Sequence, residues 1–279
     1  MKRNMFNIFV VGILFAFMIS GLNSCQKMDR PALHIIPDDT ARINGPLQLY
    51  LPFENTITDS AQYQKGIPGG TISYAEGVRG KAYQGATNAQ INFPLTPVLA
   101  NAGSFTVSFW INTQKHDGGA QCIFMLPNTG DFWGNLFATI EGNTNANDNS
   151  MLLKFNFAGN WVEFSGNNGV DRLPDMYGKW RHLAFRYDEK NSKFAAFLNG
   201  EPISLPNSVT DRMKDGAPLG KLTFSNPARF VIGAYQQHIG TSGAAETWML
   251  RYTGMLDQFR VYAKALSDTD IKSFYLNKE

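Results

Sequence analysis

The fold is decided by the stretch Lys179-Trp-Arg-His-Leu-Ala-Phe-Arg-Tyr187, the turn Asp188-Glu-Lys-Asn191, and then Ser192-Lys-Phe-Ala-Ala-Phe-Leu198, Asn199-Gly200 and Glu201-Pro-Ile-Ser204. Leu183, Phe185 and Tyr187 alternate with Ala184 and Arg186, which is the period of a strand packed on one face. Asn-Gly accepts the positive φ of a two-residue hairpin turn. The stretch therefore predicts a three-stranded antiparallel meander.

The rest of the chain repeats this character. Its 279 residues, 43% hydrophobic and 13% aromatic, can bury one large core, and 26 Gly with 13 Pro favour a turn-rich β protein. A helix is expected from Ser267, a good N-cap. The other short apolar runs predict fourteen strands and an all-β sandwich of two antiparallel sheets, with strands at 47–53, 71–75, 80–84, 89–93, 104–113, 121–126, 134–141, 151–157, 161–165, 180–187, 193–198, 201–204, 229–235 and 247–262.

Residues 1–24 read as a targeting segment. Lys2 and Arg3 precede an apolar stretch too short to span a bilayer comfortably, and Leu22-Asn-Ser-Cys25 resembles the lipobox of bacterial lipoproteins. We expect Cys25 to be lipidated, residues 25–45 to be a flexible tether, and the domain to occupy 46–279. An ordinary signal peptide cleaved near a cysteine is the alternative. A lipid anchor indicates the outer membrane, on its periplasmic or its outer side.

Charge and cysteine content exclude several function classes. The chain has 25 basic and 23 acidic residues, and removal of Lys2 and Arg3 leaves 23 of each, so a nucleic-acid partner is not expected. Cys122 has no adjacent His or paired Cys and reads as a small apolar strand residue. The four histidines show no metal-ligand spacing, and no serine elbow or phosphate-binding loop is present.

Several segments, in this order, resemble the laminin-G-like branch of the concanavalin A-like lectin and glucanase jelly rolls, here on a bacterial, Bacteroidetes-like lipoprotein. The segments are Leu51-Pro-Phe-Glu-Asn55 with Asp59, Gly77-Val-Arg-Gly-Lys-Ala-Tyr83, Ser104-Phe-Thr-Val-Ser-Phe-Trp-Ile111, Trp180-Arg-His-Leu-Ala-Phe-Arg-Tyr-Asp188, Phe197-Leu-Asn-Gly-Glu201, and Gly254-Met-Leu-Asp-Gln-Phe-Arg-Val-Tyr262 with Ala265-Leu-Ser267. The resemblance covers most of residues 46–279. It implies a two-sheet sandwich, frequent calcium binding, and carbohydrate or protein adhesion.

A glycosidase would be recognised by its pair of catalytic carboxylates. Hydrolysis of a glycosidic bond needs two of them about 5–10 Å apart. The glucanase relatives carry Glu-x-Asp-x-x-Glu on one strand, and no such run exists here. Glu141 and Glu163 stand singly on different expected strands. We therefore expect a non-catalytic protein, with a diverged glycosidase as the remote alternative.

Aromatic residues on polar strand faces indicate a binding site. Trp161 shares its face with Glu163, opposite Val162 and Phe164, which suits stacking on a sugar ring; a Trp covered by a loop is the other reading. Trp110 also lies off the main apolar face, but it matches a framework position and is read as structural. The remaining candidates lie beside polar loops and are Trp133, Trp248, Gln236, Gln237 and His238.

A metal site is centred on Asp257. Its parity matches that of Phe259 and Val261, so it is expected to face the core, where a carboxylate needs compensation. A hydrogen-bonded carboxylate is one reading. The resemblance implies the other, a structural calcium ion shared with Glu54 or Asn55.

Together these observations predict a lipid-anchored, non-catalytic glycan-binding domain of the bacterial envelope. A protein-adhesion or structural module with envelope protein partners is the alternative. A glycan binder should gather Trp161, Trp133 or Trp248 in one open groove, whereas an adhesion module should present a flat apolar patch.

Overall fold

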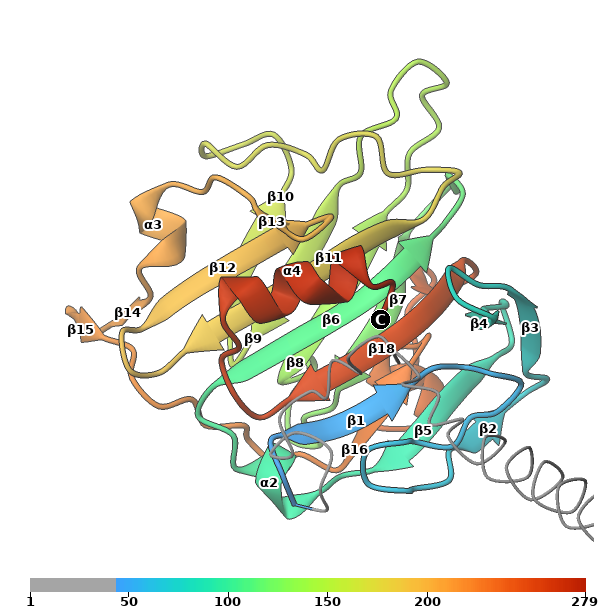
Figure 1. Ribbon diagram of the computed structural model, residues 1–279, viewed down its shortest axis with the longest axis horizontal. Helices are drawn as coiled ribbons and strands as arrows, with labels where there is room; N and C mark the ends of the chain where they lie inside the picture. Colours follow the sequence, from blue (N-terminus) through green and yellow to red (C-terminus); the bar gives the residue numbers. More distant parts are fainter. Residues whose placement is uncertain (1–43) are drawn as a thin grey trace, which may run out of the picture. The chain divides into compact units, whose positions relative to one another are not determined.

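Two eight-stranded sheets pack face to face in the computed structural model, which describes residues 44–279 (Figure 1). The two-sheet antiparallel sandwich expected from the sequence is confirmed. The first sheet contains, in spatial order, β13 (Glu201–Pro202), β12 (Lys193–Leu198), β11 (Arg181–Asp188), β6 (Phe105–Asn112), β18 (Met255–Tyr262), β4 (Lys81–Gln84) and β3 (Ser73–Glu76), with β1 (Leu47–Leu51) paired to β18.

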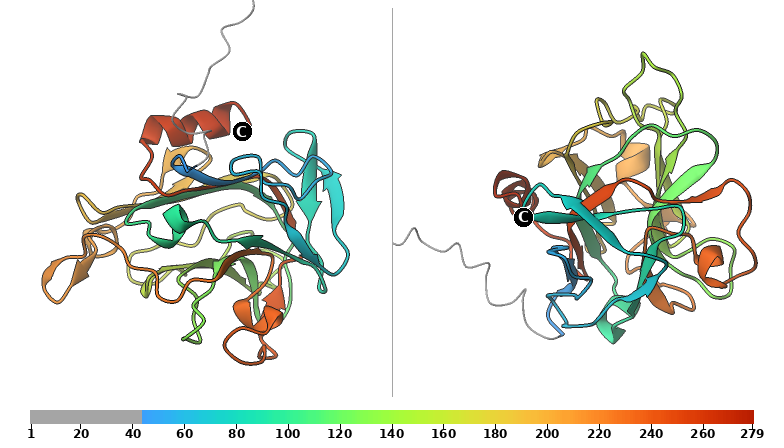
Figure 2. Two further views of the ribbon diagram at one scale, coloured as in Figure 1. Left: turned by 90° about the horizontal axis from the view of Figure 1, so that it is seen from below. Right: turned by 90° about the vertical axis from the view of Figure 1, so that its right-hand side faces the viewer.

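The second sheet lies behind the first (Figure 2). It contains β10 (Asn160–Phe164), β9 (Leu153–Phe157), β8 (Leu136–Glu141), β7 (Ala120–Leu126), β16 (Arg229–Ile232), β5 (Gln90–Pro94) and β2 (Ile67–Gly69), with β17 (Met249–Arg251) paired to β7. The short elements outside the sandwich are α2 (Pro97–Ala100), α3 (Asn207–Thr210), η1 (Gln236–Ile239) and the hairpin of β14 (Met213–Lys214) and β15 (Ala217–Pro218).

The expected meander is present as β11, β12 and β13. Asn199 and Gly200 both have positive φ, 53° and 77°, as a two-residue hairpin turn between β12 and β13 requires. Alternation on β11 places Phe185 in the core, where its ring stacks on Phe155 of β9 with centroids 4.3 Å apart. Because these two strands belong to different sheets, this contact joins the layers through aromatic packing.

The expected strand over 247–262 is two strands in different sheets. β17 runs parallel to β7 in the second sheet, and β18 lies in the first, so the chain crosses between layers at residues 252–254. Any side chain at Gly254 would collide with the hydroxyl of Tyr252, which donates to the carbonyl oxygen of Met255 at 3.1 Å. Nothing in the sequence indicated the crossing, because only the three residues 252–254 separate the two strands.

Helix α4 (Asp268–Leu276) covers the outer face of the first sheet (Figure 1). Ser267 caps it as expected: its hydroxyl accepts from the backbone N–H of Asp270 at 3.1 Å, and the Asp270 carboxylate returns the bond. Ile271 and Phe274 are buried against Tyr262 and Ala184 of the sheet. Of the two outer faces, the first is thus closed by a helix.

Of the two cysteines, one lies in the described domain and the other lies before it. Cys122 is fully buried, and burial raises the pKa of its thiol well above the usual range, as suits an inert core residue. Cys25, the signal segment and most of the tether lie outside residues 44–279. No helix within those described residues is long and apolar enough to cross a membrane.

Candidate functional site

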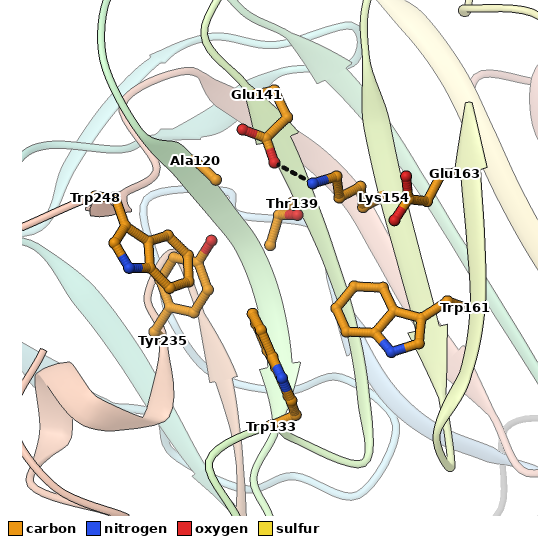
Figure 3. A pocket seen from close by; sticks show the side chains of 9 residues that line it. All are labelled: Ala120, Trp133, Thr139, Glu141, Lys154, Trp161, Glu163, Tyr235 and Trp248. Atoms are coloured by element: carbon orange, nitrogen blue, oxygen red, sulfur yellow. Dashed lines mark ion pairs between the residues drawn. The ribbon is translucent and has the colours of Figure 1, made fainter. Parts of the chain in front are cut away.

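A cavity of about 570 Å³ opens on the outer face of the second sheet, the face away from α4. Figure 3 shows tryptophans along one side of it and charged side chains along the other. We call it the aromatic cleft. Its lining residues are Ala120, Trp133, Thr139, Glu141, Lys154, Trp161, Glu163, Tyr235 and Trp248.

Strand alternation places Trp161 in the cleft. On β10, Val162 and Phe164 are buried in the core, so Trp161 and Glu163 lie on the outer face, as the sequence predicts. The register pairs Glu163 with Lys154 of β9, and Lys154 with Thr139 of β8. These side chains therefore form one row across three strands.

Trp133 comes from the loop between β7 and β8. Its ring stacks on Phe137 with centroids 5.7 Å apart and meets Trp161 edge to face at 5.1 Å. Its backbone N–H donates to the Asp131 carboxylate at 3.2 Å. Trp133 therefore stands as a fixed wall between its neighbours (Figure 3).

Trp248, just before β17, lies on the other side of Trp133 from Trp161 (Figure 3). Its ring centroid lies 5.9 Å from that of Trp133 and 5.7 Å from that of Tyr235. The backbone holds it in place, since the Trp248 carbonyl accepts from Ala120 N–H at 2.8 Å. Trp248 is 37% exposed, so its ring offers free area to a ligand. The structure thus brings Trp161, Trp133 and Trp248 into one open groove.

Three other predicted contact residues lie elsewhere. Gln236 and Gln237 are buried in η1, where the structure has a 3-10 helix rather than the expected strand end. Their amide groups both donate to the Phe132 carbonyl, at 3.1 and 2.7 Å, and so brace the loop that carries Trp133. His238 lines a different depression beside Arg251. Burial lowers the pKa of His238 to about 4, with Arg251 acting in the same direction.

The charged side of the cleft contains residues that the sequence reasoning did not assign to it. Lys154 Nζ lies 2.9 Å from Glu141 Oε1 (Figure 3). Within residues 44–279 the exposed Glu163 carboxylate has no ion-pair partner. Glu141 and Glu163 stand singly on different strands, as expected, but the strand order β8–β9–β10 brings both to one cavity with Lys154 of β9 between them. Alternation along the strand could place Glu163 on the same face as Trp161. Placing Glu141 and Lys154 in the same cavity also requires the order of the strands in the sheet.

Polar groups also lie at the floor of the cleft. The side chains of Tyr235 and Thr139 are hydrogen-bonded to each other, and burial raises the pKa of Tyr235 well above its usual range. Tyr235 therefore stays a neutral donor at any working pH. The floor offers hydroxyl groups beneath aromatic walls.

The predicted metal residues gather on the first sheet, around the loop 77–81. Asp257 is buried, but a bulge between Asp257 and Arg260 shifts the strand register, and Asp257 pairs with Trp110 on the outer face. The expected core-facing orientation is therefore wrong. The loop covers Asp257 instead, and Arg79 N–H donates to its Oδ2 at 3.1 Å.

Glu54 reaches the same loop. Its Oε2 accepts from Lys81 N–H at 3.1 Å. Burial, with a smaller contribution from the nearby Glu54 charge, raises the pKa of Asp257 to about 6. Side chains at Gly77 and Gly80 would collide with these two carboxylates, so the loop needs glycine at both positions. Asn55 follows with φ 55° and has no recorded side-chain contact to them.

A metal ion would find two carboxylates here, and no group of three His, Cys, Asp or Glu side chains occurs anywhere in the described part of the chain. The buried Asp257 carboxylate and the exposed Glu54 carboxylate beside it nevertheless fit a hard divalent ion, which takes about 6–8 oxygen ligands, many of them backbone carbonyls. The residues thus fit calcium if the 77–81 backbone supplies the remainder.

A serine–histidine pair was not anticipated. Ser108 Oγ and His182 Nε2 lie 2.8 Å apart, but both residues are buried beneath α4. Burial lowers the pKa of His182 to about 3, and Arg260 contributes in the same direction. The pair is a structural contact, since no substrate reaches it.

Comparison with known families identifies the family to which this fold belongs. The profile described as "Concanavalin A-like lectin/glucanases superfamily" matches residues 85–272, about two thirds of the chain. The chain belongs to this superfamily. No curated protein sequence matches it. The concanavalin A-like fold that the sequence resemblance implied is therefore confirmed.

Solved structures show the same fold at low sequence identity. Domain 4 of AbnA, a GH43 extracellular arabinanase from Geobacillus stearothermophilus, in complex with arabinotriose, is 20% identical with a TM-score of 0.53, covering 82% of this chain and 98% of that one. The binding domain of botulinum neurotoxin DC, in complex with rat synaptotagmin II, is 16% identical with a TM-score of 0.52, covering 85% and 53%.

A third structure is titled for the dependence of botulinum neurotoxin type C cell entry on two ganglioside molecules. It is 15% identical with a TM-score of 0.54, and the match covers 84% of this chain and 51% of that one. The concanavalin A-like domain thus spans about half the length of the neurotoxin chains. At these identities the likeness concerns the fold alone, and the cleft residues must be argued from their own geometry.

Proposed function

We propose that this concanavalin A-like domain binds carbohydrate in the aromatic cleft and does not cleave it. The observation that carries the proposal is the meeting of Trp133, Trp161 and Trp248 in one concave site of about 570 Å³. Aromatic faces pack on the apolar faces of sugar rings, while Thr139 and the charged row offer hydrogen bonds to hydroxyl groups. Bound arabinotriose in the AbnA domain is consistent with this use of the fold.

The cleft favours a glycan over an adhesion surface. In the described residues, the exposed large hydrophobic side chains number six, and two of them, Phe132 and Trp248, meet at the cleft rim with ring centroids 6.5 Å apart. A docking surface for a protein would instead present a broad, contiguous apolar patch. Within residues 44–279, the Phe132–Trp248 contact thus places exposed apolar side chains at the cleft rim, which favours the cleft as the binding site.

The glutamates do not favour hydrolysis. Glu141 and Glu163 belong to β8 and β10, with β9 between them, and Glu141 lies two residues along β8 from the residue in register with Glu163, so their backbones are roughly 12 Å apart. Lys154 occupies the intervening position and is paired with Glu141. A lysine ammonium group therefore lies between the two carboxylates, where a two-carboxylate mechanism needs room for the glycosidic bond and the attacking water.

The remaining parts of the proposal concern attachment and metal. Cys25 would carry the lipid, residues 25–45 would tether the domain, and the cleft would work at the bacterial outer membrane, on either of its sides. Envelope proteins remain candidate neighbours of a protein so anchored. Asp257 and Glu54, with Asn55 beside them, would hold a structural calcium ion far from the sugar.

The test is a glycan array on residues 44–279, followed by calorimetry on the glycan bound most tightly. Trp161→Ala, Trp133→Ala and Trp248→Ala should each lower affinity roughly 10- to 100-fold, because buried Trp contacts dominate binding sites. Tyr63→Ala is the matched control, since Tyr63 is 70% exposed and outside the cleft. An array without signal, or unchanged affinity in all three tryptophan variants, refutes the proposal.

A further inference from the structure

A second cavity of about 270 Å³ adjoins the aromatic cleft. The two cavities share Trp133 and Trp161, whose edge-to-face contact forms a common wall. The lining of the second cavity is mostly polar: Asn128, Asp131, Trp133, Gly134, Asn135, Asn156, Ala158, Gly159, Trp161, Thr223 and Ser225. An apolar-walled cavity thus continues into a polar one across a pair of tryptophans.

Asn156 in the wall of the second cavity has an unused donor. It is 1% exposed, on β9, in register with Trp161. Its Oδ1 accepts from Gly159 N–H at 3.3 Å, but its Nδ2 has no hydrogen-bond partner. A buried donor without a partner is unfavourable, so it calls for an explanation. A ligand hydroxyl or ring oxygen in the second cavity would supply the missing acceptor.

The charges of the two cavities have one dominant sign. Their linings contain the carboxylates of Asp131, Glu141 and Glu163 and a single ammonium group, that of Lys154. Lys154 is already paired with Glu141. An anionic ligand would therefore meet two carboxylates without a matching cation, and like charges brought together in a partly desolvated site repel.

We propose that the two cavities are adjacent subsites for one uncharged oligosaccharide of at least two sugar units. This inference rests on the proposed function and adds ligand length and charge to it. One unit packs among Trp248, Trp133 and Trp161, and the next passes the tryptophan pair and accepts a hydrogen bond from Asn156. Uronic-acid, sialylated and sulfated glycans are rejected by Glu163 and Asp131.

Calorimetry on residues 44–279 tests ligand length with arabinose, arabinobiose and arabinotriose, and with gluco- and xylo-oligosaccharides of one to four units. Affinity should rise at least about tenfold from one unit to two or three in the series that binds. Thr223→Trp places bulk at an exposed position in the second cavity. It should abolish this rise and leave monosaccharide affinity unchanged, whereas Tyr63→Ala should keep the rise.

Asn156→Ala is the direct test of the buried donor. It should reduce the gain from the second unit several-fold, provided that its thermal midpoint confirms folding; Thr223→Trp carries the test if it does not. Equal affinity for a monosaccharide and its trimer overturns the two-subsite proposal while leaving glycan binding intact. Failure of every sugar, together with a blank array, overturns both proposals.

Charge selectivity is tested with trigalacturonate against the neutral trimers. The acidic trimer should bind at least about tenfold more weakly, and Glu163→Lys should narrow this difference because it reverses the free charge at the cleft rim. Glu201→Lys, at an exposed carboxylate outside both cavities, is the matched control. Equal binding of acidic and neutral trimers by the unaltered protein overturns the proposed selectivity.

Discussion

Two tryptophans leave the core by the same alternation rule and end in opposite environments. Trp110 on β6 is 5% exposed because α4 covers the outer face of the first sheet, and its ring stacks on Tyr275 with centroids 5.5 Å apart. Trp161 on β10 faces an open cavity on the second sheet. Alternation therefore tells which side chains leave the core, whereas the cover over each face decides whether they support the fold or meet a ligand.

The polar neighbours of the two tryptophans differ in the same way. Beside Trp110, the Ser108–His182 pair is closed off by α4. Beside Trp161, Glu163 and Lys154 face the cavity. A pair of residues that resembles catalytic machinery is therefore structural on one face, and a plain row of charges becomes a ligand surface on the other.

Of the changes suggested by comparing the two outer faces, substitution of Trp110 should have the largest effect on stability. Trp110→Ala should lower the free energy of unfolding by about 3–5 kcal/mol, because it empties the space between the sheet and Tyr275. Urea denaturation measures this loss. Trp161→Ala, the matched change on the open face, should lower it by less than about 1 kcal/mol. If Trp161→Ala destabilises the domain more than Trp110→Ala does, the distinction between the two faces fails.

A second covered group on the first sheet, Asp257, predicts a pH effect. Its pKa in the folded state is about 6, against an ordinary value of 3.8, so the folded domain binds this proton more tightly than the unfolded chain. The contribution is therefore fully present below about pH 4 and is lost as the pH rises through 6. The loss is at most about 3 kcal/mol. Urea denaturation at pH 4, 5, 6 and 7 measures it as the change in the stability difference between the metal-free domain and its Asp257→Asn variant, because the lowered pKa values of His182 and His238 act in the opposite direction in both proteins.

Calcium sharpens this prediction. An ion bound by Asp257 and Glu54 favours both ionised carboxylates, so saturating calcium should raise stability at pH 7 and flatten its pH dependence. Asp257→Asn should remove the response to calcium and the part of the pH dependence that Asp257 contributes, whereas His182 and His238, whose folded-state pKa values of about 3 and about 4 lie below the ordinary 6.5, should still make stability rise between pH 4 and 6.5. A residual slope is expected from Asp59, whose pKa burial also raises. A thermal midpoint at pH 7 that calcium and chelator leave unchanged contradicts the metal proposal.

Much of the fold follows from local pattern. The meander, the Ser267 cap and the outward face of Trp161 depend on alternation and capping over a few residues, and the structure confirms them. The failures depend on long-range pairing. The bulge after Asp257 reverses its face, and the crossing at Gly254 divides one apolar run between two sheets.

The site shows the same limit. Trp133 and Trp248 were found because they lie beside polar loops, but alternation could not show that η1 would bury Gln236 and Gln237 under one of those loops. Nor could it bring Glu141 and Glu163 to one cavity, since this requires the order β8–β9–β10. The predicted residues differ from the observed cleft because strand order, and the elements that cover each face, cannot be read from a short stretch of sequence.

The smallest predicted effect concerns Ser267, the N-cap of the helix α4 that covers the first sheet. Ser267→Ala removes the hydroxyl that accepts from Asp270 N–H and should lower the free energy of unfolding by about 1 kcal/mol, because the first turn of α4 loses its cap. Hydrogen exchange should rise in α4 and at Trp110, and glycan affinity at the cleft should not change, because the cleft lies on the other sheet. A change in glycan affinity would show that the two outer faces are coupled through the core.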